Sequence, residues 1–184
     1  LKIRTVIYAP DGKSVTEKIF AGKTVDGQPL VQNFIVENPK LWSPESPFLY
    51  EAVSEIYADG TLSDVYRTRF GIRSIEYIPE KGFFLNGQRR KFQGVCNHHD
   101  LGPLGAAVNE SALRHQLLLL KDMGCDAIRT SHNMPAPELV RLCDELGLIV
   151  WQDFMFACAV YDLSEEFEEN IIAEFKDNIK RLRH

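Results

Sequence analysis

Three groups of polar residues in the second half of the sequence carry side chains of the types found in active sites and binding sites. Each follows a short apolar run: Asn97–Asp100 after the first run, Arg129–Asn133 after the second, and Gln152-Asp153 after the third. Three of the five histidines of the chain fall within the first two groups. If the apolar runs are parallel strands, the groups lie at one edge of a sheet, where α/β barrels place their active sites.

We therefore expect four side chains to gather at that edge: His98, Arg129, His132 and Asp153. Neighbouring strands lie ~4.8 Å apart, so the four should fall within roughly 15 Å of one another. Asn133, which also follows the second run, is a weaker candidate.

The chemistry of these groups allows three interpretations. Histidine nitrogens and carboxylate oxygens suit zinc, which His98, His99, His132 and Asp153 would bind. Adjacent histidines point in different directions from a strand, however, so both rarely bind one ion. Imidazole, amide and carboxylate groups also bind the hydroxyls of a sugar around a shallow pocket, and we favour this over zinc. The third interpretation is that these groups only cap loops.

A strand–helix repeat must position these residues. The apolar runs predict strands at 91–96, 127–131 and 148–151, and a helix follows each. Such alternation is typical of a doubly wound sheet or of a (β/α)8 barrel, and a whole barrel needs about 250 residues. Three of its eight units would then be present, and both ends of the chain look like cuts through a longer protein. An incomplete barrel leaves its inner face open, so we expect exposed apolar surface or a homo-oligomer.

The three helices have recognisable boundaries. We expect the first over Glu110–Met123, with Asn109 as its N-cap. The second spans Glu138–Leu146 and ends at Gly147. Ser164 caps the third helix. The apolar stripe of this third helix consists of Phe167, Ile171, Phe175, Ile179 and Leu182.

The first 80 residues predict an all-β domain. Apolar and polar residues alternate in Leu30–Val36 and in Leu49–Tyr57, as in half-buried strands. Asp59-Gly60 between two alternating runs is a hairpin signal. Several short strands separated by turns are typical of a β-sandwich.

Composition and charge restrict the classes of partner that the protein can bind. The net charge is −5 and no basic run is visible, which argues against nucleic acid. No apolar run approaches the ~20 residues of a membrane span, so we expect no membrane either. A neutral oligo- or disaccharide suits this balance as a substrate, and we expect no cofactor.

The cysteines and tryptophans are expected in the core. None of the four cysteines has the close spacing of a metal site, so we predict reduced core residues over a disulfide or zinc. They are Cys96, Cys125, Cys143 and Cys158. Reduced cysteines fit a reducing compartment, but the sequence does not decide between cytoplasm and periplasm. Trp42 and Trp151 are each more typical of a core residue than of a platform that stacks on sugar.

Four ordered motifs within residues 31–154 resemble glycoside hydrolase family two. They are Leu41–Tyr50 (LWSPESPFLY), Phe70–Glu76 (FGIRSIE), Phe84–Gly87 followed by Gly94–Asp100 (FLNG, GVCNHHD), and Ile128–Asn133 with Leu142–Leu148 (IRTSHN, LCDELGL). The resemblance implies an immunoglobulin-like sandwich at residues 1–79, truncated at its amino terminus, and the first three units of a TIM barrel at 80–184.

The resemblance also implies a retaining exo-β-glycosidase, in which two carboxylates act as acid/base and nucleophile. In the family the acid/base glutamate follows the fourth barrel strand and the nucleophile lies on the seventh, so both would lie beyond His184. By motif position, His98 and His132 resemble the histidines that bind the terminal sugar, with Asn133 and Asp153 as further contacts. Arg129 resembles the arginine that orients the nucleophile and keeps it ionised.

The motifs identify the family more specifically than they identify the sugar. The stretches around His98 and Arg129 favour a β-galactosidase, whereas the run Trp151–Ala159 resembles the β-mannosidase branch. A β-glucuronidase of the same family is a further alternative, as is a non-catalytic carbohydrate-binding or interaction module. The acidic magnesium ligands of some β-galactosidases would fall near Ala157, which cannot bind a metal, so we expect none.

Overall fold

The computed structural model describes residues 1–23, 28–155 and 164–182. The chain forms two compact units, one comprising Leu1–Trp42 with Phe48–Arg73 and the other Ser43–Pro47 with Ser74–His184. All described helices belong to the second unit, and none is long and apolar enough to cross a membrane. The domain boundary expected at residues 79 and 80 stays a prediction.

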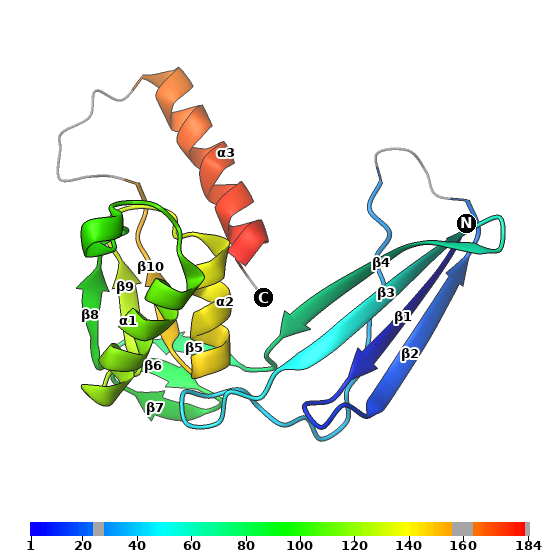
Figure 1. Cartoon of the computed structure of the whole chain (residues 1–184), viewed down its shortest axis with the longest axis horizontal. Helices are drawn as coiled ribbons and strands as arrows, with labels where there is room; N and C mark the ends of the chain where they lie inside the picture. Colours follow the sequence, from blue (N-terminus) through cyan, green and yellow to red (C-terminus); the bar gives the residue numbers. More distant parts are fainter. Residues whose placement is uncertain (24–27, 156–163, 183–184) are drawn as a thin grey trace. The chain divides into compact units, whose positions relative to one another are not determined.

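The first unit is built on one antiparallel sheet with the strand order β2-β1-β3-β4 (Figure 1). Its strands are β1 (Lys2–Tyr8), β2 (Ser14–Ala21), β3 (Tyr50–Ala58) and β4 (Thr61–Phe70). β1 pairs with β2 in one antiparallel hairpin, and β3 pairs with β4 in another. β1 also pairs with β3, so the chain between β2 and β3 leaves the sheet and then returns to it.

The β3–β4 hairpin confirms the turn expected from sequence. Asp59 and Gly60 have φ angles of 49° and 81° between the paired residues Ala58 and Thr61. Positive φ at both central residues is what a two-residue turn of type I′ requires, and Asp-Gly adopts it at little cost.

The strand expected over Leu30–Val36 is wrong, because residues 28–36 pair with no strand among the described residues. The alternation nevertheless has a physical basis. Val31 and Ile35 are exposed, whereas Phe34 and Val36 line a pocket of about 460 Å³ together with residues of the sheet. An extended segment with one apolar side needs a surface to cover, and this one covers a sheet without joining its ladder.

Trp42 is a core residue of the first unit, as expected. Its side chain is 0% exposed, and its backbone N–H donates to the carbonyl of Ile72 at 2.8 Å. A Cβ at Gly71 would come within 2.9 Å of the Trp42 side chain, so only glycine fits there. The Arg73 guanidinium lies 4.6 Å from the centre of the indole ring, in a cation–π contact.

The second unit begins with a small antiparallel sheet of order β5-β6-β7. These strands are β5 (Ile75–Ile78), β6 (Gly82–Leu85) and β7 (Gln88–Arg90). Phe83 and Leu85 point to its buried side, as the expected short strand at this position implies.

A parallel sheet of order β10-β9-β8 follows, as expected (Figure 1). Its strands are β8 (Gly94–Asn97), β9 (Ala127–Thr130) and β10 (Ile149–Gln152). Residues 91–93 precede the ladder, so β8 starts later than predicted. The pairing aligns Cys96 with Arg129 and Arg129 with Trp151.

The helices lie close to their expected positions. They are α1 (Glu110–Asp122), α2 (Pro137–Leu146) and α3 (Glu165–Leu182), with a short 3-10 helix, η1, at Gly102–Leu104. The Asn109 side chain accepts a hydrogen bond from Ala112 N at 3.0 Å, and the Ser164 hydroxyl accepts one from Phe167 N at 3.2 Å. These are the N-caps predicted from sequence.

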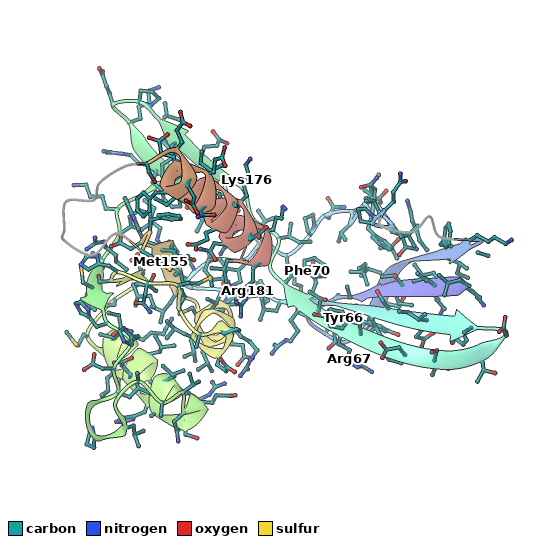
Figure 2. The ribbon with its side chains drawn as sticks, turned by 90° about the horizontal axis from the view of Figure 1, so that it is seen from above. Tyr66, Arg67, Phe70, Met155, Lys176 and Arg181 are labelled. Carbon is teal, nitrogen blue, oxygen red and sulfur yellow. The ribbon has the colours of Figure 1, made fainter. Side chains whose placement is uncertain are left out.

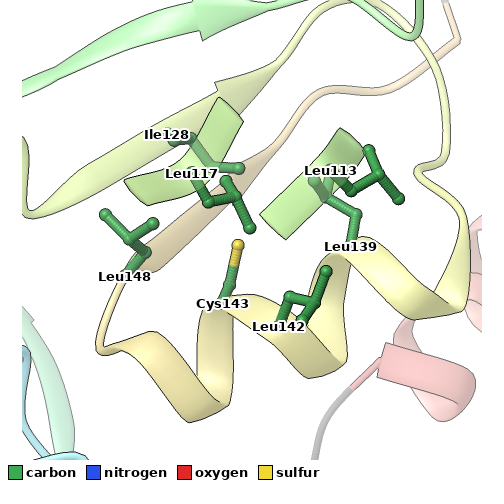
Figure 3. Close-up of a cluster of buried hydrophobic side chains, with 7 residues drawn as sticks. All are labelled: Leu113, Leu117, Ile128, Leu139, Leu142, Cys143 and Leu148. Carbon is green, nitrogen blue, oxygen red and sulfur yellow. The ribbon is translucent and has the colours of Figure 1, made fainter. Parts of the chain in front are cut away.

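Helices α1 and α2 cover one face of the parallel sheet and form the core of the second unit (Figure 3). Each fully buried leucine contributes about 1.5–3 kcal/mol through loss of contact with water. The core consists of Leu113, Leu117, Ile128, Leu139, Leu142, Cys143 and Leu148.

Three of the cysteines and tryptophans expected in the core are not buried. Cys143 is 0% exposed, and burial raises the pKa of its thiol, as expected of a core residue. Cys96 is exposed and Cys125 is half-buried, however, while Cys158 lies outside the described residues. Trp151 is 54% exposed. Cys96 and Trp151 lie on the sheet face opposite the helices, and sequence periodicity does not show whether that face is covered.

The apolar stripe of helix α3 is partly exposed to solvent. Phe175 is 48% and Ile179 is 49% exposed. The Phe175 ring nevertheless packs edge-on against the Phe154 ring, with the ring centres 4.8 Å apart. Lys176 and Arg181 project from this helix (Figure 2), and the basic side chains in its last turn suit the helix dipole.

The segment Ser43–Pro47 docks at the amino ends of the parallel strands within the second unit. Arg90 pairs with Glu45, and its Nε also donates to Asp126 at 3.0 Å. A Cβ at Gly147 would meet the carbonyl oxygen of Pro44 at 2.4 Å. This end of the sheet is therefore held by charge pairs and by one close backbone approach.

We expect Gly147→Ala to destabilise the protein more than Gly124→Ala. Both glycines have positive φ, 75° and 91°, which costs an alanine roughly 1–2 kcal/mol. A Cβ at Gly124 meets nothing within 4 Å, so only Gly147→Ala adds the steric conflict with Pro44, worth about 1–3 kcal/mol more. Melting temperatures of the two variants test this, and equal losses would contradict it.

Acid should weaken the Glu45–Arg90 pair in a defined window. The hydrogen bonds from Arg90 lower the pKa of the Glu45 carboxyl from 4.5 to about 2. The depressed value means that this contribution to stability is complete above pH 4.5 and is lost as the pH falls towards 2. The advantage of wild type over Glu45→Gln in melting temperature should therefore shrink across that window. A Glu174→Gln variant on α3 serves as control, and a constant difference between wild type and Glu45→Gln would argue against the pairing.

Candidate functional site

The carboxyl ends of β8, β9 and β10 bring the predicted residues together. His98 follows β8 directly, His132 lies two residues after β9, and Asp153 follows β10. Arg129 lies within β9 and points to the face opposite the helices, because the preceding side chain, Ile128, points into the helix-covered core. Parallel pairing in order therefore produces the shared edge that the sequence predicts.

Asp153 is the centre of this cluster. Its Oδ1 accepts a hydrogen bond from Arg129 Nε at 2.9 Å, and its Oδ2 accepts one from Arg129 Nη2 at 2.6 Å. His132 Nδ1 lies 2.5 Å from the same Oδ2. The hydrogen bonds from His132 and then from Arg129 lower the pKa of the Asp153 carboxyl, so the group is an ionised acceptor at neutral pH.

The two histidines are neighbours. Because the ionised Asp153 only accepts hydrogen bonds, Nδ1 of His132 must carry the hydrogen between them. In the neutral ring, Nε2 is then an acceptor. The ring centre of His98 lies 5.9 Å from that of His132, with the ring planes at 85°. The imidazoles thus meet edge to face at the end of the sheet.

Arg129 also contacts a residue that the sequence analysis expected in the core and not in the site. Its Nη1 donates to the Sγ of Cys96 at 3.2 Å, across the register that pairs the two residues. The hydrogen bond from Arg129 lowers the pKa of the Cys96 thiol. The sequence held one signal for this contact, which is the position of Cys96 three residues before His99. In the sheet, Cys96 and Arg129 lie on the same face of neighbouring strands.

A pocket of about 220 Å³ lies beside the cluster, between the loops that follow β8 and β9. His98 and Asn133 are among its lining residues, whereas Arg129, His132 and Asp153 are not. The Asn133 amide donates to the carbonyl of Met134 at 3.2 Å. Its role as a sugar contact stays a prediction, as do those of the other four residues.

A metal site finds no support in the described geometry. Within residues 1–23, 28–155 and 164–182, no three His, Cys, Asp or Glu side chains are arranged to hold a metal ion. Asp153 directs its oxygens at a guanidinium and an imidazole hydrogen instead. Ala157, the position at which the family resemblance argued against magnesium, lies outside the described residues.

Two family models match the chain. The model described as "Glycosyl hydrolases family 2" matches residues 1–73, and "Glycosyl hydrolases family 2, TIM barrel domain" matches residues 77–182. Each covers one part of the two-part organisation expected from the sequence.

Relatives with assigned names include two kinds of glycosidase. The protein named Beta-galactosidase BoGH2A from Bacteroides ovatus is 45% identical over 145 residues, which make up 78% of this chain and 17% of that protein. A β-glucuronidase from Streptococcus agalactiae is 32% identical over 177 residues, or 96% of this chain and 27% of that protein.

The fold has solved counterparts as well. The crystal structure of a β-glycosidase from Bacteroides vulgatus superposes with a TM-score of 0.78 at 37% identity, covering 99% of this chain and 24% of that one. The chain thus spans 17% to 27% of the length of these three proteins.

We expect Cys96 to react faster with iodoacetamide than Cys125 at pH 7, because Arg129 stabilises its thiolate. Arg129→Met should slow the alkylation of Cys96 several-fold and leave that of Cys125 unchanged. Mass spectrometry of the alkylated peptides over time measures both rates. Equal slowing at the two cysteines would indicate a general change in structure, and no slowing would contradict the contact.

Proposed function

The chain belongs to glycosyl hydrolase family 2, and on that premise we propose that the whole protein is an exo-β-glycosidase that removes a terminal β-linked sugar, with β-galactosides as its first substrate class. The chain supplies the family's immunoglobulin-like domain followed by the start of its TIM barrel. The observation that carries the proposal is the cluster of His98, Arg129, His132 and Asp153 at the carboxyl edge of the barrel strands.

In this proposal the residues of the chain bind and orient, and the carboxylates that break the bond lie elsewhere in the protein. A retaining glycosidase uses two carboxyl groups about 5–5.5 Å apart, one as acid/base and one as nucleophile. His98 and His132 bind sugar hydroxyls through their imidazoles, and Asn133 adds an amide at the neighbouring pocket. Arg129 donates to the nucleophile, which keeps that carboxylate ionised and aimed at the anomeric carbon.

The lining of the pocket beside His98 supports a neutral sugar first. A glucuronide carries a carboxylate, which proteins usually bind with arginine or lysine. The pocket is lined by no arginine or lysine among the described residues, and the guanidinium of Arg129 already faces Asp153. β-Glucuronides are the second candidate, because relatives named β-glucuronidase match as much as 96% of the chain.

Two further alternatives are distinguished by the same assays. The resemblance of Trp151–Ala159 to β-mannosidases adds β-mannosides to the substrates, although residues 156–159 lie outside the described part of the chain. A non-catalytic carbohydrate-binding module would bind sugar without turnover in the whole protein.

We predict that the 184-residue chain has no glycosidase activity alone, whereas the whole protein hydrolyses a nitrophenyl β-glycoside. The reason is that the two family carboxylates are expected outside the chain. Nitrophenol release from the β-galactoside, β-glucuronide and β-mannoside measures this for both proteins. Turnover by the short chain that His98→Ala abolishes would overturn the assignment of the carboxylates, and no turnover by the whole protein would favour the binding module.

In the whole protein, His98→Ala and His132→Ala should each raise the barrier by about 2–4 kcal/mol, because sugar hydroxyls lose a hydrogen bond in the transition state. This corresponds to a roughly 30- to 1,000-fold loss in kcat/KM. His115→Ala, on the exposed side of α1, is the matched control and should leave kcat/KM unchanged. Wild-type kcat and KM in His132→Ala would remove this histidine from the sugar site.

A further inference from the structure

We propose that Asp153 is a positioning residue, a single carboxylate that holds His132 and Arg129 in place for catalysis without touching the sugar. The inference rests on the proposed function and changes the role that the sequence suggests for this residue, which is a sugar contact. Its basis is the number and direction of the hydrogen bonds that Asp153 receives from within the chain.

The acceptor capacity of Asp153 is largely used by the protein. A carboxylate offers about four lone-pair positions. Three are taken, by Arg129 Nε, Arg129 Nη2 and His132 Nδ1, at 2.9, 2.6 and 2.5 Å. The Asp153 side chain is only 15% exposed. Both positions on Oδ2 are occupied, so a sugar hydroxyl could reach that oxygen only by displacing a charge-assisted hydrogen bond, and one position on Oδ1 is left.

The first consequence concerns His132. The carboxylate binds the hydrogen on Nδ1 and thereby selects one tautomer and one plane of the ring. In that plane the ring meets His98 edge to face, with the centres 5.9 Å apart. The hydrogen bond that Asp153 accepts from Nδ1 therefore orients His132 directly and His98 through the contact between the two rings.

The second consequence concerns Arg129. Its Nε and Nη2 form a two-pronged contact with Asp153, while Nη1 donates to Cys96. Three of the five N–H groups of a guanidinium are thus engaged, and the other two lie on Nη1 and Nη2, at the end of the group. The negative charge of Asp153 offsets part of the positive charge of Arg129. Arg129 consequently acts on a nucleophile more by the direction of its hydrogen bonds than by net charge.

One shared carboxylate couples the two functions. Asp153→Asn preserves the size of the side chain but replaces one acceptor oxygen with a donor NH2 group. An amide oxygen in the place of Oδ2 still accepts from His132 Nδ1 and Arg129 Nη2 but sets the NH2 group against Arg129 Nε. The reverse orientation sets the NH2 group against both of the other donors, and in either orientation the negative charge that strengthens these bonds is lost. Both sugar binding and orientation of the nucleophile should therefore weaken in this variant.

A double-mutant comparison in the whole protein tests the inference. We expect Asp153→Asn alone to lower kcat/KM at least about tenfold on a nitrophenyl β-glycoside. In a background of His132→Ala with Arg129→Lys, the same substitution should cost less than about threefold, because its two targets are already changed. Asp153→Glu, which retains the charge, should recover part of the loss. Asp122→Asn at the end of α1 is the control and should match wild type.

Each contrary outcome has a distinct meaning. An equal loss from Asp153→Asn in both backgrounds would show direct contact with the sugar and overturn the inference, as would wild-type kcat/KM in Asp153→Asn. Crystal structures of the whole protein and its Asp153→Asn variant give a readout independent of activity. We expect the His132 ring or the Arg129 guanidinium to move, and unmoved side chains would overturn the inference. An inactive wild-type protein would instead refute the proposed function, leaving the crystallographic result to decide the role of Asp153.

Discussion

The in-register parallel pairing of β8, β9 and β10 is the constraint on which the site depends. It sets Cys96 beside Arg129 and ends all three strands at one level, so that His98, His132 and Asp153 emerge together. Side chains alternate along a strand, so a shift of one residue would turn Arg129 into the core and expose Ile128. The leucines of α1 and α2 that enclose Ile128 therefore stabilise the register, and with it the geometry of the site.

At each end of this sheet, one charged side chain binds two partners, and the consequences differ between the two ends. At the amino ends, Arg90 is shared by Glu45 and Asp126, and these contacts bind the segment Ser43–Pro47 to the unit. At the carboxyl ends, Asp153 is shared by Arg129 and His132, and these contacts orient groups with catalytic potential. In barrels of this kind the amino end serves stability and the carboxyl end serves chemistry. The proposed roles of the two clusters conform to that division.

Local signals in the sequence predicted the elements well because their causes are local. Asn109 and Ser164 cap their helices through hydrogen bonds to residues three positions away, and Asp59-Gly60 turns a hairpin by its own φ preference. Predictions failed where burial depends on a distant neighbour. Leu30–Val36 alternates like a strand but pairs with none in the described chain, and Trp151 is apolar but half-exposed on the sheet face opposite the helices.

The sequence by itself determined which side chains stand at the strand ends and, through its motifs, the family to which the chain belongs. It also determined that the strands run parallel, because a helix connects each to the next. Only the tertiary structure decided which of those side chains contact one another. Arg129 and Asp153 are 24 positions apart, and their contact exists because two strands pair in one register. That register comes from packing across the whole sheet, which no short stretch of sequence encodes.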